Sequence, residues 1–289
     1  DTVTGAVAPT GRRVGPVGLV HNSVLVTSGT CVTSAASGVE AIPGRSASWL
    51  WPTHAVVTRR GDPATGTSVT VFAQRIVRTG PGAFDFRRVA TSVVDLRVAW
   101  GGGVSVGRVR DVAGASTLWG AAVVVAGATT WLYGTRDAGP GTFGRDLLLA
   151  QAPTRTVGDR STWRYRTRDG WSATSARAVV VRRGEQGVSM VLSGSMVGGR
   201  TVLVTKPQEF LDDRVVALSA PHPWGPWTQR TLLLAPSTGT APQYSPALVV
   251  GAGATRAVVV VNRTSTSLTT LVTDSAAARP AFYDVDLAG

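Results

Sequence analysis

The sequence predicts an all-β protein, and its repeat pattern favours a five-bladed β-propeller. Valine and threonine, which are β-branched and favour strands over helices, are abundant along the chain. Short apolar runs alternate with turns that contain glycine, in a chain of 289 residues with 34 glycines and 16 prolines. Similar segments begin at Trp51, Leu118, Val188 and Tyr244, which are 67, 70 and 56 residues apart. A period of this size fits the four strands and loops of one propeller blade.

The expected strands follow the chain mostly in pairs. In order, they are residues 17–26, 55–58 with 68–73, 93–100, 121–125 with 129–133, 188–192 with 201–205, and 248–250 with 257–261. Glycine-containing turns separate the paired runs, as in β-hairpins. No segment sustains a period near 3.6 over about 11 residues, so no long amphipathic helix is expected.

We expect residues 1–289 to form a single propeller domain. Its first unit, which starts at about Val17, is short, because it begins only 34 residues before Trp51. Two explanations stay open for the short unit. The ring closes with strands from both ends of the chain, or the domain lacks its most N-terminal strand. A β-sandwich with a similar number of strands is the main alternative fold.

The chain is strongly basic, with a formal net charge of +12. Lys206 is its only lysine, against 28 arginines. Such a balance fits nucleic acid, anionic lipid or an anionic polymer as partner, or it reflects the codon bias of a GC-rich genome. The arginines are spread along the chain, and no nucleic-acid motif surrounds their densest group, which is Arg160, Arg164, Arg166 and Arg168. We therefore expect no nucleic-acid partner.

Several classes of site are not expected. Cys31 is the only cysteine, so no intrachain disulfide can form, and three histidines without clustered acids or cysteines make no metal signature. The sequence has no Gly-x-Ser-x-Gly in a strand–turn–helix context and no Gly-x-Gly-x-x-Gly that opens a helix. No apolar stretch reaches the ~18 residues that cross a membrane. We expect no cofactor, no metal and no membrane span, and we expect a monomer.

A series of short motifs runs along nearly the whole chain. In order, they are Asp1-Thr2 with Gly5, His21-Asn22-Ser23, Trp51-Pro52, Trp119-Gly120-Ala121-Ala122, Trp131-Leu132-Tyr133-Gly134-Thr135, Gly170-Trp171-Ser172, Gly225-Pro226-Trp227, Tyr244-Ser245-Pro246, and Arg279-Pro280 before Phe282. In this order and spacing the chain resembles secreted five-bladed propellers of the endo-D-arabinanase glycoside hydrolase family. The resemblance implies endo-acting hydrolysis of furanoside links in cell-wall D-arabinan, at a central funnel, by a secreted or cell-surface protein.

The resemblance also implies the residues of the site. Hydrolysis at an anomeric carbon normally uses two carboxyl groups, one as acid and one as nucleophile or base. Asp1 matches the motif carboxylate of the family and is the candidate catalytic residue. The second carboxylate lies upstream of Asp1 or is absent. The candidate sugar contacts, in which rings stack and polar groups bind hydroxyls, are His21, Asn22, Trp51, His54, Trp119 and Tyr133.

Other features leave alternative functions open. The remaining carboxylates, including Glu185 and Glu209, are mostly in contexts typical of loops and turns, and Trp224 and Trp227 are interpreted as a rigid corner between strands. The chain also departs from the family at residues 188–192, where a glutamate is common, and near Tyr244, where a His-Pro-Glu-like segment is common. A non-catalytic propeller that binds polysaccharide is therefore one alternative. A protein-interaction propeller whose basic face docks an acidic partner is another.

Overall fold

The computed structural model of the chain describes residues 47–80, 85–100, 103–251, 256–274 and 276–287, together with Ile42 and short strands among the first 34 residues. The chain divides into two compact units. Unit 1 comprises Asp1–Ala115 and Ser267–Ala276, and unit 2 comprises Ser116–Thr266 and Ala277–Gly289. The single domain expected over residues 1–289 stays a prediction.

Unit 1 is built on one antiparallel sheet with the strand order β10-β9-β8-β7. Its strands are β7 (Ser48–Arg59), β8 (Thr67–Arg78), β9 (Phe86–Val98) and β10 (Val104–Gly114). The middle strands β8 and β9 are buried over much of their length. Their apolar side chains form a core with β7 and Ile42, which includes Leu50, Val71 and Val94.

Shorter elements complete the described part of unit 1. They are β1 (Thr2–Val3) paired with β4 (Leu19–Val20), β2 (Ala6–Val7) with β3 (Arg13–Val14), and β5 (Leu25–Ser28) with β6 (Cys31–Ser34). Helix α1 (Leu268–Thr273) begins at Ser267, whose hydroxyl accepts a 3.2 Å hydrogen bond from the Thr270 amide. Among the described residues, no helix has the length and apolar character needed to cross a membrane.

Unit 2 contains three antiparallel sheets. The first has the order β11 (Leu118–Ala126), β12 (Thr129–Asp137), β13 (Arg145–Pro153), β14 (Arg164–Thr167) and β15 (Gly170–Ser172), with β16 (Val180–Arg182) also paired to β13. The second has the order β17 (Ser193–Val197), β18 (Arg200–Thr205), β19 (Arg214–Ala220) and β20 (Thr228–Leu234). The third has the order β21 (Gln243–Val250), β22 (Arg256–Arg263) and β23 (Ala281–Asp286). Short 3₁₀ turns link these strands: η1 (Thr154–Thr156), η2 (Arg160–Thr162), η3 (Ser175–Arg177), η4 (Gly184–Gln186) and η5 (Glu209–Leu211).

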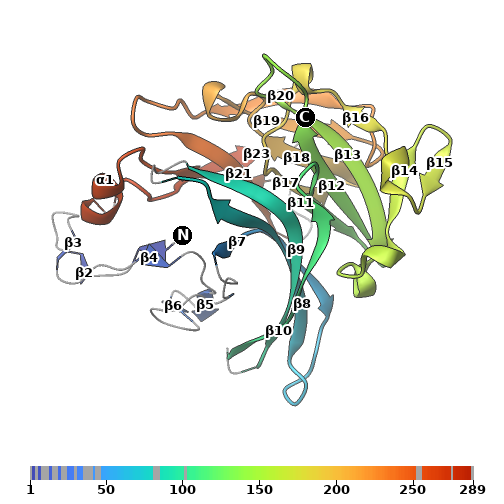
Figure 1. Cartoon of the computed structure of the whole chain (residues 1–289), viewed down its shortest axis with the longest axis horizontal. Helices are drawn as coiled ribbons and strands as arrows, with labels where there is room; N and C mark the ends of the chain where they lie inside the picture. Colours follow the sequence, from blue (N-terminus) through green and yellow to red (C-terminus); the bar gives the residue numbers. More distant parts are fainter. Residues whose placement is uncertain are drawn as a thin grey trace. The chain divides into compact units, whose positions relative to one another are not determined.

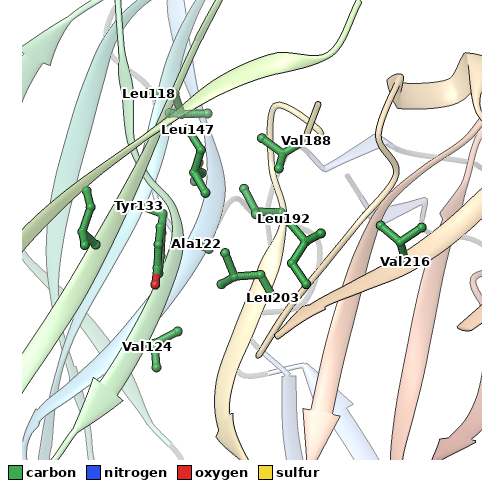
Figure 2. Packing of buried hydrophobic residues seen from close by; sticks show 12 residues of the cluster. Leu118, Ala122, Val124, Tyr133, Leu147, Val188, Leu192, Leu203 and Val216 are labelled. Atoms are coloured by element: carbon green, nitrogen blue, oxygen red, sulfur yellow. The ribbon is translucent and has the colours of Figure 1, made fainter. Parts of the chain in front are cut away.

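The three sheets of unit 2 stack through their first strands. β11 contacts β17, and β17 contacts β21 (Figure 1). One apolar cluster joins the first and second sheets, and Figure 2 shows its members Leu118, Tyr133, Leu203 and Val216. A second cluster joins the second and third sheets through side chains such as Val259 of β22. Each sheet of unit 2 thus buries one face or both against its neighbours.

The approach of β17 to β11 is close at Gly194. A Cβ atom at this position would lie 2.5 Å from Cδ2 of Leu203 and 2.8 Å from Cγ2 of Val124. Any larger residue would have to displace these packed side chains, which glycine avoids. The glycine therefore sets how closely the first two sheets of unit 2 pack.

The predicted all-β class is confirmed. In unit 2, consecutive up-and-down sheets that pack through their first strands have the arrangement of propeller blades. The described residues contain four sheets of three or more strands, and not the five blades that the sequence predicts. The predicted first unit, from about Val17, falls largely on residues outside the described part of the chain.

Most predicted strand pairs are present, but one strand is displaced. The hairpin expected over residues 121–133 is β11 and β12, and the run 201–205 is β18. The strand expected over residues 188–192 is wrong, because β17 begins only at Ser193. Residues 188–192 instead form backbone hydrogen bonds with separate elements. Val188 O accepts from the Arg145 amide at 3.0 Å, and the Leu192 amide donates to Ala121 O at 3.0 Å. These divergent bonds leave no ladder with β18.

Candidate functional site

The residues that the sequence proposes as a site fall into three groups. Asp1, His21 and Asn22 lie outside the described residues, so their roles stay predictions. Trp51 and His54 lie on β7 of unit 1. Trp119 and Tyr133 lie on β11 and β12 of unit 2.

The two residues on β7 are half-buried. The ring of Trp51 meets that of Phe86 edge-on, with centroids 4.6 Å apart, and that of Trp49 at 6.2 Å. The guanidinium of Arg78 lies 5.8 Å from the centroid of Trp49. Trp51 therefore belongs to an aromatic cluster on this sheet. Sugar contact by Trp51 or His54 stays a prediction.

Trp119 and Tyr133 are packed inside unit 2. Trp119 is 3% exposed and lies edge-on to Trp163 at 6.2 Å and to Tyr165 at 5.0 Å. Tyr133 is fully buried, and its hydroxyl donates a 2.7 Å hydrogen bond to Pro223 O. Burial raises the pKa of Tyr133 well above its ordinary value. In this structure neither ring presents a face on which a sugar can stack.

Three other tryptophans of unit 2 form a partly exposed cluster, which we call the tryptophan surface. It consists of Trp131 on β12, Trp171 on β15 and Trp224 in the loop between β19 and β20. The ring centroids of Trp131 and Trp171 are 5.7 Å apart, and Trp224 lies 6.3 Å and 6.1 Å from them. All three rings pack on the buried core of unit 2 and stay partly exposed. The core therefore supports an aromatic area that solvent reaches.

Strand register brings Trp131 and Trp171 to one face of the first sheet. Trp131 is opposite Gln151 of β13, and Gln151 is opposite Arg164 of β14. On the β14–β15 hairpin, Arg166 is opposite Trp171. Residues directly opposite each other, or two apart along a strand, share a face. Both tryptophans and both arginines therefore project from the same side of the sheet.

The loop between β19 and β20 places Trp224. Pro223 O accepts the hydrogen bond of the buried Tyr133 hydroxyl, which ties the loop to the core. The Gly225 amide donates to His222 O at 3.0 Å, and Gly225 has a φ of +101°, a conformation that favours glycine. The His222 ring stacks on Trp224, with centroids 5.1 Å apart and planes 12° from parallel. The loop thus holds Trp224 in a defined orientation.

Arg166 completes the tryptophan surface. Its guanidinium carbon lies 4.9 Å from the ring centroid of Trp224 and 5.7 Å from that of Trp171. Both distances fit a cation–π interaction. The Arg166 Nη1 atom also donates to Gly170 O at 3.3 Å. The surface therefore combines aromatic rings with a positive charge.

A second polar cluster of unit 2 surrounds Glu209 in η5. The Glu209 side chain is 13% exposed, and its Oε1 atom accepts a hydrogen bond from the Met190 amide. The same oxygen lies 3.9 Å from Nε of Arg145, which also pairs with Asp137. Two carboxylates thus contact one guanidinium. Glu209 has a φ of +55°, a left-handed conformation that is uncommon outside glycine.

Burial dominates the electrostatics of Glu209. It raises the pKa of the carboxyl to about 7, against the opposing effects of the Met190 amide and the charges of Arg145 and Lys206. Such a carboxyl is partly protonated at neutral pH. This is the property that a general acid needs.

Lys206 lies close to Glu209 and is fully buried. Its Nζ atom donates a 2.6 Å hydrogen bond to Ala235 O, at the end of β20. Desolvation lowers the pKa of the amine, while the charges of Asp213, Asp212 and Glu209 oppose the decrease. Across the ranges that the structure describes, no group of three or more His, Cys, Asp or Glu side chains is placed to hold a metal ion.

Sequence reasoning missed both clusters. It interprets Trp224 as part of a structural corner and Glu209 as a loop residue, and it gives Trp131 and Trp171 no role. One local signal was present on β14, where Arg164 and Arg166 alternate with the buried Tyr165 and Thr167. With Trp171 in the returning strand, this alternation indicates a hairpin whose open face carries arginine and tryptophan.

The sheets and the tryptophan surface define an all-β protein with blade-like sheets and an exposed aromatic site. The chain belongs to the DUF5005 family, a domain of unknown function whose model matches residues 1–250. No curated protein matches the chain.

Several solved structures are similar to the chain. An exo-1,5-α-L-arabinanase from a bovine ruminal metagenomic library has a TM-score of 0.43 and 13% identity, over 82% of this chain and 80% of that one. A family 117 glycoside hydrolase of the marine bacterium Zobellia galactanivorans has a TM-score of 0.41 and 10% identity, over 86% and 74% of the two chains. A GH43 enzyme from Xanthomonas citri has a TM-score of 0.37 and 11% identity, over 81% and 87%. These similarities assign no role to any residue of this chain.

Proposed function

We propose that this protein binds a cell-wall polysaccharide through the tryptophan surface of unit 2. The observation that carries the proposal is the set of three partly exposed rings, Trp131, Trp171 and Trp224, held on a buried core. Indole rings offer a rigid apolar face and a polar edge, which suits sugars because sugars also combine apolar C–H faces with hydroxyls. The resemblance of the sequence to endo-D-arabinanases supports a cell-wall polysaccharide as the ligand, and soluble arabinan is the first polymer to test. We further propose that the protein works outside the cell, secreted or at the cell surface, and that it is a monomer.

Changing Trp171 to alanine is expected to weaken binding to soluble arabinan about 2- to 12-fold, since one aromatic contact is worth about 0.5–1.5 kcal/mol. Affinity electrophoresis in gels with increasing arabinan measures the dissociation constant. Trp171 lies on a short edge hairpin, so Trp171→Ala should keep the far-UV circular dichroism spectrum of the folded protein at the temperature of the binding assay.

Trp100→Ala is the matched control, because Trp100 is 71% exposed and lies in unit 1. This variant should bind arabinan as the parent protein does. If Trp171→Ala, Trp131→Ala and Trp224→Ala all keep the parent affinity, the tryptophan surface is not the binding site.

A second candidate function is endo-acting hydrolysis of D-arabinan, and the protonation of Glu209 favours it. A glycosidase acid must keep its proton near neutrality until it transfers the proton to the leaving oxygen. The pKa of about 7 gives Glu209 this property. The partner carboxylate within unit 2 would be Asp137, which shares Arg145 with Glu209.

Glu209→Gln is expected to lower the release of reducing ends from D-arabinan by at least about 100-fold, the usual contribution of a general acid. Asp137→Asn should lower it as well if Asp137 supplies the second carboxylate. Glu185→Gln, at an exposed glutamate of the same unit, is the control and should keep full activity. Arabinan binding without any release of reducing ends would leave binding as the whole function.

A further inference from the structure

Arginines line the open face of the hairpin that carries Trp171. On β14, the side chains of Arg164 and Arg166 alternate with the buried Tyr165 and Thr167, so the two arginines project from the face of the sheet that carries Trp131 and Trp171. Arg168 follows in the turn and is exposed. The tryptophan surface therefore continues directly into a row of positive charges.

In the part of the chain that the structure describes, these arginines have no carboxylate partner. Elsewhere in the described part of the chain, five arginines pair with acids within 4 Å: Arg75, Arg110, Arg136, Arg145 and Arg214. No ion pair among the described residues includes Arg164, Arg166 or Arg168. Arg164 donates only to the backbone oxygens of Ser161 and Trp163. Among the residues that the structure describes, no carboxylate thus forms an ion pair within 4 Å of these three guanidinium groups.

Arg166 joins the row of charges to the aromatic rings. Its guanidinium carbon is 4.9 Å from the ring centroid of Trp224 and 5.7 Å from that of Trp171, and its one hydrogen bond goes to Gly170 O. A guanidinium has five N–H donors in a fixed plane, and it matches a carboxylate with two parallel hydrogen bonds. Donors of Arg166 stay available beside the rings.

We propose that the ligand of the tryptophan surface is an acidic polysaccharide, whose sugar rings contact the exposed parts of the tryptophan rings while their carboxylates bind Arg164, Arg166 and Arg168. This inference rests on the proposed glycan binding and adds the chemical class of the sugar. A neutral arabinan would use the rings alone. A polymer of uronic acids would use the rings and the charges together.

The test compares two polymers with the same sugar backbone: polygalacturonate and the same polymer with its carboxyl groups reduced to alcohols. The parent protein should bind polygalacturonate at least tenfold more tightly at low salt. Its preference for polygalacturonate over the reduced polymer should decrease as the sodium chloride concentration rises, because salt screens contacts between exposed charges. The double variant Arg164→Gln/Arg168→Gln should bind polygalacturonate about 3- to 10-fold more weakly, because it loses two exposed charge contacts. Binding of this variant to the reduced polymer should not change.

The matched control is Arg256→Gln/Arg263→Gln, which removes the same charge from exposed positions at the two ends of β22. This control variant should prefer polygalacturonate over the reduced polymer as strongly as the parent protein does. If the control loses as much affinity for polygalacturonate as Arg164→Gln/Arg168→Gln does, the inference is overturned, since the net charge of the protein would then explain the binding. Equal affinity for the two polymers, reduced for both by Trp171→Ala, would overturn the acidic class and leave the proposed glycan binding intact. Failure to bind either polymer or arabinan would overturn both.

Discussion

Replacing Trp163 with alanine is expected to lower the free energy of unfolding of unit 2 by about 4 kcal/mol, the cost of truncating a large buried ring. The indole is fully buried, and its Nε1 atom donates a 2.8 Å hydrogen bond to Val157 O. Its ring lies edge-on to Trp119 at 6.2 Å and to Tyr165 at 6.3 Å. Alanine would leave a cavity between these rings and a buried carbonyl without its donor. Urea unfolding followed by far-UV circular dichroism measures the change.

Two variants control this result. Trp100→Ala removes a tryptophan that is 71% exposed, so its free energy of unfolding should change by less than about 0.5 kcal/mol. Trp163→Phe keeps most of the ring volume but loses the hydrogen bond to Val157 O, so its cost should lie between those of the two alanine variants. Equal costs for Trp163→Ala and Trp100→Ala would show that the packing around Trp163 does not stabilise the protein.

The stability of the protein is expected to decrease as the pH rises from about 4.5 to about 7, because of Glu209. Its carboxyl has a pKa of about 7 in the folded chain, against 4.5 as the ordinary value. In this range the folded state binds more protons than the unfolded state, so each increase in pH favours unfolding. The shift corresponds to a decrease of about 3 kcal/mol in the free energy of unfolding, and this decrease is complete above about pH 7. Below about pH 4.5, Glu209 is protonated in both the folded and the unfolded state, so it does not lower the free energy of unfolding.

Glu209→Gln isolates this contribution. Glutamine keeps an oxygen that accepts the Met190 amide hydrogen bond, and it stays neutral at every pH. The variant should match the parent protein at pH 4.5 and exceed its free energy of unfolding by about 3 kcal/mol at pH 8. Glu185→Gln, at an exposed position, should follow the parent curve throughout. Parallel curves for Glu209→Gln and the parent protein would falsify the raised pKa.

The hairpins of the fold could be predicted because their signals are local. The run 121–133, for example, has β-branched strands around Gly127, whose φ is +61° in the turn between β11 and β12. The displaced start of β17 could not be predicted in this way. Residues 188–192 are as apolar as a strand, but their hydrogen bonds go to Arg145, Thr205 and Ala121, which are distant in sequence. Tertiary contacts therefore decide this boundary.

The site was harder to predict, because exposure depends on contacts between distant segments. Trp119 and Trp131 stand in similar apolar motifs only 12 residues apart. Trp119 is buried by Trp163 and Tyr165, whereas Trp131 stays partly exposed beside Trp171. No local pattern separates the two tryptophans. The raised pKa of Glu209 likewise comes from burial by segments that the sequence around it does not contain.

The position of Lys206 has a practical consequence for chemical labelling. It is the only lysine of the sequence, and its amine is buried against Ala235 O. A reagent that acylates side-chain amines can reach it only when the segment after β18 opens, and the arginines do not compete for such a reagent. The labelling rate at this one residue therefore reports the frequency of local opening in the second sheet of unit 2, not the area of its surface.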